Sequence, residues 1–127
     1  MITVFVYGTL KQGEKNHYII QPYVQTISKG KLQGELLHLG PYPALFVDGL
    51  QNDVHGEWIV LSKEALAPMD HLEGYISVDH PDNDYERIWV TALDELGCHR
   101  EGWTYIYKDR KDYPVISDGI WRNALSK

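Results

Sequence analysis

The segment Val6-Tyr7-Gly8-Thr9-Leu10 joins a β-branched and aromatic stretch to a glycine that directly follows it. A glycine there lets the backbone turn sharply and present consecutive N–H groups to an anion such as a carboxylate or phosphate. The segment has neither the Lys-Ser or Lys-Thr pair of a P-loop nor the glycine spacing of a dinucleotide fingerprint. Taken alone, it is more typical of an ordinary turn at the end of a strand.

Glu73 is a candidate general acid and base within Met69-Asp70-His71-Leu72-Glu73-Gly74-Tyr75. It falls in the last turn of a predicted helix, where the macrodipole disfavours a negative charge. Partial burial beside Leu72 and Tyr75 would raise its pKa and make it a base near neutral pH. A solvated glutamate beside a helix-ending glycine is the more common reading of such a local pattern.

Three further groups carry weaker signals. Tyr85 and Arg87 lie two residues apart on a predicted strand, so they share a face and are predicted to point toward a common cavity; a surface cross-strand pair is the alternative. Asp70 and Glu73 resemble the carboxylate pair of a glycosidase, but neighbours on one short helix flank a sugar bond poorly. An alternating aromatic face reads by itself as core packing; it comprises Trp103, Tyr105 and Tyr107.

Length and composition bound the class of protein. The 127 residues and 14.6 kDa correspond to one domain, 1–127. With 12 basic against 18 acidic residues and no basic cluster, the chain is a poor nucleic-acid binder. No apolar run reaches the roughly 18 residues of a membrane span, and no secretory signal is evident. The single Cys98 and scattered histidines predict no metal site and a reducing, cytoplasmic location.

The elements that position these residues are mostly strands joined by short turns. A helical piece is expected from Asn16 to Pro22, a helix from Ser62 to Gly74, and a short terminal helix from Ser117 through Leu125. This order predicts an antiparallel or mixed sheet curled toward a barrel. The predicted strands are Ile2–Tyr7, Lys31–Leu39, Ala44–Val47, Val54–Leu61, Tyr85–Leu93 and Cys98–Lys108.

Together these segments resemble the γ-glutamylcyclotransferase-like family, and more closely its small bacterial and γ-glutamylamine-type members. The resemblance spans nearly the whole chain. The combination of the first loop, the Asp-x-x-Glu-Gly sequence and Tyr-x-Arg is its most specific part. It rests on Phe5–Lys11, Gly13, Asn16-His17, Gly34, Gly40–Ala44, Gly56, Met69–Tyr75 and Tyr85-Glu86-Arg87.

The resemblance implies an α+β fold, a small mixed β-barrel of about six strands with short flanking helices. It also implies release of 5-oxoproline from a γ-glutamyl amine or peptide, without a cofactor. The α-amine of the substrate would attack its own γ-carbonyl, with Glu73 as acid and base. The loop of Tyr7, Gly8, Thr9 and Leu10 would hold the γ-glutamyl group, through its α-carboxylate or the developing oxyanion. Tyr85 and Arg87 are typical residues of the family's substrate site.

The C-terminal segment departs from the family pattern. The family often shows Ser-Gly-Asp-Trp, whereas this chain has Ser117-Asp118-Gly119-Ile120-Trp121. The sequence therefore leaves open the leaving amine, the pathway and the oligomeric state. A non-catalytic module that binds a small carboxylate on the same fold is the alternative function. Retention of Glu73 favours the enzyme, because a carboxylate beside an anionic ligand would weaken binding.

Overall fold

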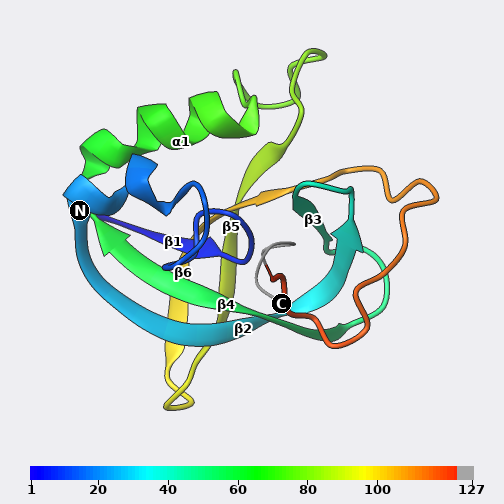
Figure 1. Cartoon of the computed structure of the whole chain (residues 1–127), viewed down its shortest axis with the longest axis horizontal. Helices are drawn as coiled ribbons and strands as arrows, with labels where there is room; N and C mark the ends of the chain where they lie inside the picture. The colour runs from blue at the N-terminus through cyan, green and yellow to red at the C-terminus, as the bar shows by residue number, and fades with distance from the viewer. Residues whose placement is uncertain (123–127) are drawn as a thin grey trace.

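The computed structural model describes residues 1–122 of the chain, which form six strands and one α-helix joined by turns and loops (Figure 1). Three single 3₁₀ turns complete the regular structure. In chain order the elements are β1 (Ile2–Val6), η1 (His17–Ile19), η2 (Gln21–Tyr23), β2 (Val24–His38), β3 (Pro43–Phe46), β4 (Asn52–Leu61), η3 (Lys63–Ala65), α1 (Leu66–Glu73), β5 (Glu86–Asp94) and β6 (His99–Ile106).

Five of the strands close into a barrel. Around the ring, β1 pairs with β4, β4 with β2, β2 with β5, β5 with β6, and β6 returns to β1. The pairing of β6 with β1 is parallel and the other four are antiparallel, so the barrel is mixed, as predicted. The sixth strand, β3, lies between the ends of β2 and β6 and pairs with both.

The long β2 strand makes this closure possible. Its first two-thirds, from Val24 to Gly34, pairs with β4, while Glu35–His38 pairs with β3. Gly56 on β4 and Gly102 on β6 lie where neighbouring backbone passes very close. A Cβ at Gly56 would lie 2.3 Å from the Val6 carbonyl oxygen, and one at Gly102 would lie 2.2 Å from that of Thr3. Glycine at these two positions therefore lets β1 sit tightly between its partners.

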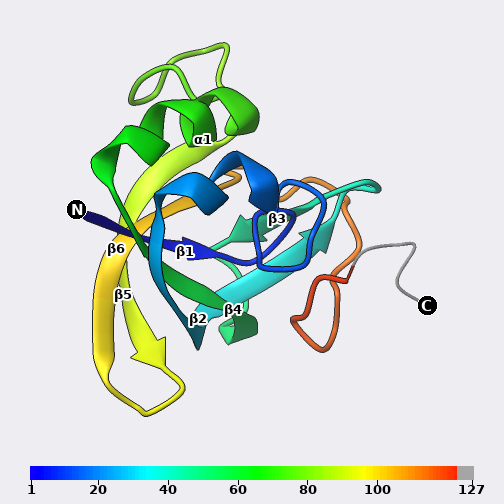
Figure 2. The same ribbon diagram turned by 60° about the vertical axis from the view of Figure 1, so that its left-hand side comes forward.

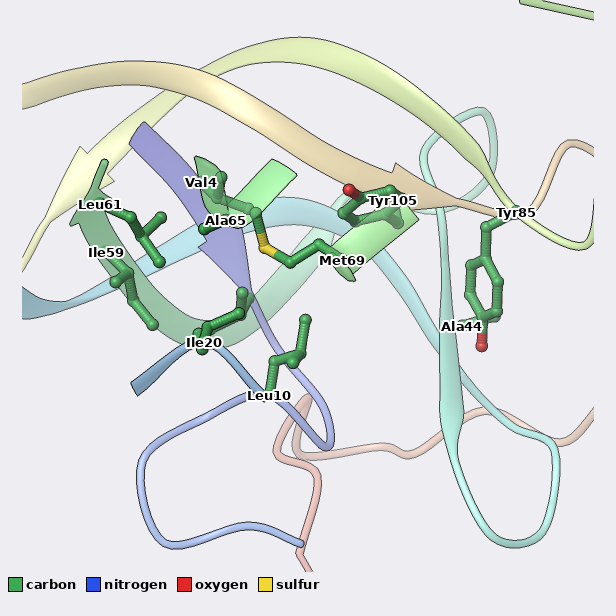
Figure 3. Packing of buried hydrophobic residues seen from close by; sticks show 11 residues of the cluster. Val4, Leu10, Ile20, Ala44, Ile59, Leu61, Ala65, Met69, Tyr85 and Tyr105 are labelled. Carbon is green, nitrogen blue, oxygen red and sulfur yellow. The ribbon is translucent and has the colours of Figure 1, made fainter. Parts of the chain in front are cut away.

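The α1 helix covers one side of the barrel, away from the tip of the β5–β6 hairpin (Figures 1 and 2). Its Met69 is fully buried and points into a cluster formed by side chains from β1, β4 and the 3₁₀ turns (Figure 3). This packing fixes the helix relative to β1 and therefore fixes the residues at its C-terminal end. The fully buried members of the cluster are Val4, Ile20, Ala44, Ile59, Leu61, Ala65 and Met69.

Several predicted boundaries change. The strand expected from Lys31 begins at Val24, because the first half of β2 alternates exposed polar residues with partly buried ones along β4. The helical piece expected from Asn16 consists of two separate 3₁₀ turns, and Pro22 lies inside the second instead of ending a helix. The helix expected from Ser62 is a 3₁₀ turn followed by α1, in which Pro68 is the third residue.

The predicted terminal helix is wrong over residues 117–122, which form a turn and extended chain. Backbone hydrogen bonds tie this segment to β2 and β4: the N–H of Ile116 donates to the Leu36 carbonyl, and the N–H of His55 donates to the Gly119 carbonyl. Pairing with the barrel therefore replaces helical hydrogen bonds. Residues 123–125 of the predicted helix lie outside the described residues.

In residues 1–122, no helix is long and apolar enough to cross a membrane.

Candidate active site

A pocket of about 250 Å³ opens where β1 ends, beside the C-terminal end of α1. The loop after β1, the start of β3, the residue before β5 and the end of β6 form its walls. The lining residues are Phe5, Val6, Tyr7, Gly8, Thr9, Leu10, Lys15, Asn16, Tyr42, Pro43, Leu72, Glu73, Asp84, Tyr85, Tyr105 and Tyr107.

Glu73 is the last residue of α1 and contributes its carboxyl group to this pocket. The helix ends there because Gly74 adopts the left-handed conformation, with φ of 64°, and its N–H returns to the carbonyls of Asp70 and His71. The Glu73 carboxyl group has no hydrogen-bond or ion-pair partner in residues 1–122. Loss of hydration raises its pKa from 4.5 to about 7. At neutral pH this carboxyl group can therefore both accept and donate a proton.

The loop after β1 is held in a fixed shape. The Asn16 side chain donates to the Thr9 hydroxyl (2.9 Å), and the backbone N–H of Asn16 donates to the Thr9 carbonyl (2.9 Å). Gly8 packs against Pro43, and a Cβ at Gly8 would lie 2.8 Å from the proline Cγ. In the described chain, the backbone N–H groups of Gly8, Thr9 and Leu10 donate no hydrogen bond. These donors are therefore available to a ligand in the pocket.

Tyr7 and Tyr85 brace the pocket walls. The Tyr7 hydroxyl donates to the Tyr105 carbonyl (2.6 Å) and accepts from the N–H of Leu45 (3.1 Å). The Tyr85 hydroxyl donates to the Pro43 carbonyl (2.6 Å). Burial, with a smaller contribution from the negative charge of Glu73, raises the pKa of both phenols well above 10. Both therefore remain neutral and present mainly their ring faces to the pocket.

Arg87 does not line the pocket but lies behind its wall. Its guanidinium pairs with Asp70 and lies between two aromatic rings. The Cζ atom is 4.7 Å from the ring centroid of Tyr75 and 4.8 Å from that of Trp103. The other Asp70 oxygen accepts a hydrogen bond from the Tyr105 hydroxyl (2.6 Å). Asp70 is one helical turn before Glu73, so this network ties the end of α1 to β5 and β6.

The structure thus brings together six of the seven candidate residues, Tyr7, Gly8, Thr9, Leu10, Glu73 and Tyr85, around one cavity. Arg87 is the exception: the shared strand face with Tyr85 does not bring it into the cavity, because the Asp70 carboxylate and two aromatic rings hold it outside.

Sequence reasoning did not single out several lining residues. Pro43 enters the sequence analysis only within the Gly40–Ala44 stretch of the family resemblance, and no motif marks Lys15 or Asp84. Tyr105 and Tyr107 belonged to the alternating aromatic face that the sequence alone assigns to core packing. Their role as pocket wall follows from the barrel closure, which places the end of β6 next to the end of β1.

The described part of the chain contains no group of three or more His, Cys, Asp or Glu side chains that could hold a metal ion.

Comparison with known proteins identifies the family. Residues 4–123 match the family described as gamma-glutamyl cyclotransferase, AIG2-like. The chain belongs to this family. It is 37% identical over 123 residues to gamma-L-glutamyl-butirosin B gamma-glutamyl cyclotransferase of Niallia circulans, covering 96% of this chain and 76% of that protein. The γ-glutamylcyclotransferase-like protein described here is therefore an enzyme of the cyclotransferase class.

Solved structures show the same fold. The chain superposes on an AIG2-like protein from Mus musculus with a TM-score of 0.72 and 22% identity, covering 100% of this chain and 98% of the other. It superposes on a gamma-glutamyl cyclotransferase with a TM-score of 0.61 and 17% identity, covering 90% and 69% of the two chains. The predicted α+β barrel is thus confirmed, with five strands in the ring and β3 as the added strand.

Proposed function

We propose that this cyclotransferase releases 5-oxoproline from a γ-glutamyl amine or peptide by intramolecular cyclisation. The observation that carries the proposal is the Glu73 carboxyl group, which has a pKa of about 7 and lies in the same cavity as the unpaired N–H groups of the Gly8–Leu10 loop. This reaction needs one group that moves protons near neutral pH and one site that holds a carboxylate.

Glu73 has two protons to move in the proposed reaction. The substrate's α-ammonium transfers one proton to the carboxylate, and the resulting amine attacks the γ-carbonyl carbon to form a tetrahedral intermediate. The protonated Glu73 donates that proton to the leaving nitrogen as its bond to the γ-carbon breaks, and the regenerated carboxylate accepts the second proton from the ring nitrogen and passes it to the released amine. The products are the neutral lactam of 5-oxoproline and a protonated amine, so no water is consumed. One carboxyl group with a pKa of about 7 suits both proton transfers.

The Gly8–Leu10 loop is the proposed site for the substrate's α-carboxylate. Its three N–H groups are available, and Lys15 on the same loop is the one basic side chain among the described residues that line the pocket. Binding the carboxylate here and the α-nitrogen near Glu73 would hold the substrate folded. The nitrogen then stays close to the γ-carbonyl, which removes much of the entropic cost of ring closure.

Arg87 is proposed to act through Asp70 instead of binding substrate. The Arg87–Asp70 pair and the Tyr105 hydrogen bond hold the last turn of α1 against the barrel. Because Glu73 ends this turn, its carboxyl group depends on the pair for its orientation. Tyr85 is proposed to shape the cavity through its ring, since its hydroxyl is already bound to the Pro43 carbonyl.

The test is 5-oxoproline release from a panel that includes a γ-glutamyl-α-amino acid, γ-glutamyl-ε-lysine and a γ-glutamyl alkylamide. We expect release from at least one member, and its loss in the Glu73→Gln variant. Calorimetric binding of the panel without release would instead favour the carboxylate-binding module. Equal release by the variant would refute the assignment of Glu73.

A further inference from the structure

The part of the pocket that the γ-glutamyl group leaves free has its own charge pattern. If the α-carboxylate lies on the Gly8–Leu10 loop and the α-nitrogen beside Glu73, Tyr42, Asp84 and Tyr107 are the remaining lining residues whose side-chain polar groups form no hydrogen bond within residues 1–122. These residues are available to the leaving amine. The kind of amine that this part of the pocket accepts is inferred on the basis of the proposed cyclisation.

Asp84 is held beside Glu73 by the backbone. Its N–H donates to the Gly74 carbonyl (2.9 Å), and its Oδ2 lies only 2.3 Å from where a Cβ on Gly74 would be. Gly74 directly follows Glu73, so the two carboxyl groups lie on adjoining parts of the wall. The Asp84 side chain is exposed and forms no ion pair with any residue from 1 to 122. It therefore carries a negative charge that the described chain leaves uncompensated.

Tyrosine side chains line the same cavity as this carboxylate. Tyr107 packs on Tyr85 with 4.8 Å between ring centroids and on Tyr113 with 6.1 Å, and Tyr42 lies 6.5 Å from Tyr85. Burial raises the pKa of Tyr107 to about 12, and the charges of Asp84 and Glu73 both contribute. Neither the Tyr107 nor the Tyr42 hydroxyl forms a hydrogen bond within the described residues.

A carboxylate bordered by tyrosine rings attracts a cation, through its charge and through the negative faces of the rings. The same group repels a second carboxylate, which every γ-glutamyl-α-amino acid carries on its leaving side. We infer that Asp84, with Tyr42 and Tyr107, forms a leaving-group subsite for an amine that bears a second positive charge. The substrate class is thus a γ-glutamyl derivative of a diamine or polyamine.

Three isosteric γ-glutamyl amides test this subsite. Their leaving amines are 1,4-diaminobutane, pentylamine and 4-aminobutyrate, which end in an ammonium, a methyl and a carboxylate group. We expect kcat/KM for the diamine derivative to exceed that for the pentylamide by roughly tenfold, and the carboxylate derivative to be the poorest. The preference for the diamine should weaken as ionic strength rises, because the subsite is exposed.

Asp84→Asn should reduce the ratio of kcat/KM for the diamine derivative to kcat/KM for the pentylamide from about tenfold to nearly one. Asp84→Lys should make kcat/KM higher for the carboxylate derivative than for the diamine derivative. Asp82→Asn is the matched control, because Asp82 is exposed on the same loop but does not line the pocket. The control should keep the wild-type ratio, which distinguishes a local contact from a change in net charge.

The outcomes separate this inference from the proposed reaction. Release of 5-oxoproline from all three amides with equal kcat/KM, or a ratio that Asp84→Asn does not change, would overturn the subsite and leave the cyclisation standing. Release from none of the amides by the folded protein would overturn the subsite, and the absence of release from the γ-glutamyl-α-amino acid and γ-glutamyl-ε-lysine as well would overturn the cyclisation. A tenfold preference that Asp84→Asn abolishes and Asp82→Asn retains would establish the subsite.

Discussion

Exchanging Glu73 for glutamine should make the protein inactive and, at alkaline pH, more stable. Glutamine keeps the shape of the side chain but cannot carry a proton between the two substrate nitrogens. We expect a loss of roughly 10²–10⁴-fold in kcat, the usual contribution of a positioned acid–base group. In the wild-type enzyme, kcat/KM should rise with pH around a pKa of about 7, because the ionised carboxylate must accept the first proton.

The stability gain follows from the same pKa. Burial raises the pKa of Glu73 from 4.5 to about 7, so between these values the folded state binds more protons than the unfolded state. Wild-type stability therefore falls as pH rises through this window, whereas glutamine does not titrate. The shift corresponds to an advantage for the variant of about 1 kcal/mol at pH 5 and at most about 3 kcal/mol at pH 8.

Urea unfolding of both proteins at pH 5 and pH 8 measures this difference, and 5-oxoproline release measures the activity. Glu101→Gln removes the same charge from an exposed position on β6 and serves as the control. The control should show neither the loss of activity nor a stability gain that grows with pH. If Glu73→Gln had the same stability relative to wild type at both pH values, Glu73 would not be desolvated. If it retained full activity, the carboxyl group would not move the protons.

The walls of the pocket give three further predictions. Arg87→Ala should lower the free energy of unfolding by roughly 2 kcal/mol, because Asp70 loses its partly buried partner, and should lower kcat more than it raises KM; an unchanged kcat in the folded variant would refute the positioning role. Gly8→Ala should cost about 1–3 kcal/mol by urea unfolding, because the new methyl group meets Pro43, and a stability equal to wild type would contradict that contact. Tyr7→Phe leaves two buried backbone groups without partners and should cost about 1–3 kcal/mol; a smaller loss in thermal unfolding would mean that they find other partners.

The parts of the fold that local patterns determine could be predicted from the sequence. Ile2–Val6 is uncharged and β-branched, and it forms the barrel strand that was expected. Gly74 has the left-handed conformation that ends a helix, so the position of Glu73 at the end of α1 also followed from the sequence. The sequence also predicted the direction of the shift in the Glu73 pKa, which burial of the carboxyl group raises in the structure.

The other features depend on contacts between distant segments. Arg87 and Tyr85 share a strand face, but only the packing of α1 on the barrel places Asp70 in reach of the arginine. The segment 117–122 has a plausible cap in Ser117, yet the open edges of β2 and β4 supply hydrogen bonds that a short helix could not match. Local helix and strand propensities depend on neighbouring residues in the sequence, so they cannot predict either of these long-range contacts.

The tyrosine content of the chain explains how the pocket desolvates the Glu73 carboxyl group. Tyr7, Tyr85 and Tyr105 each direct the hydroxyl to a carbonyl or carboxylate partner in the wall, so the rings line the cavity without leaving a polar group unsatisfied. Phenylalanine would make the cavity equally apolar but would leave those partners unpaired, and charged residues would solvate Glu73. The hydrogen-bonded tyrosines therefore connect the segments that form the pocket wall, and their rings exclude water from the Glu73 carboxyl group. The resulting desolvation raises the pKa of Glu73 to about 7, where one side chain can serve as both base and acid.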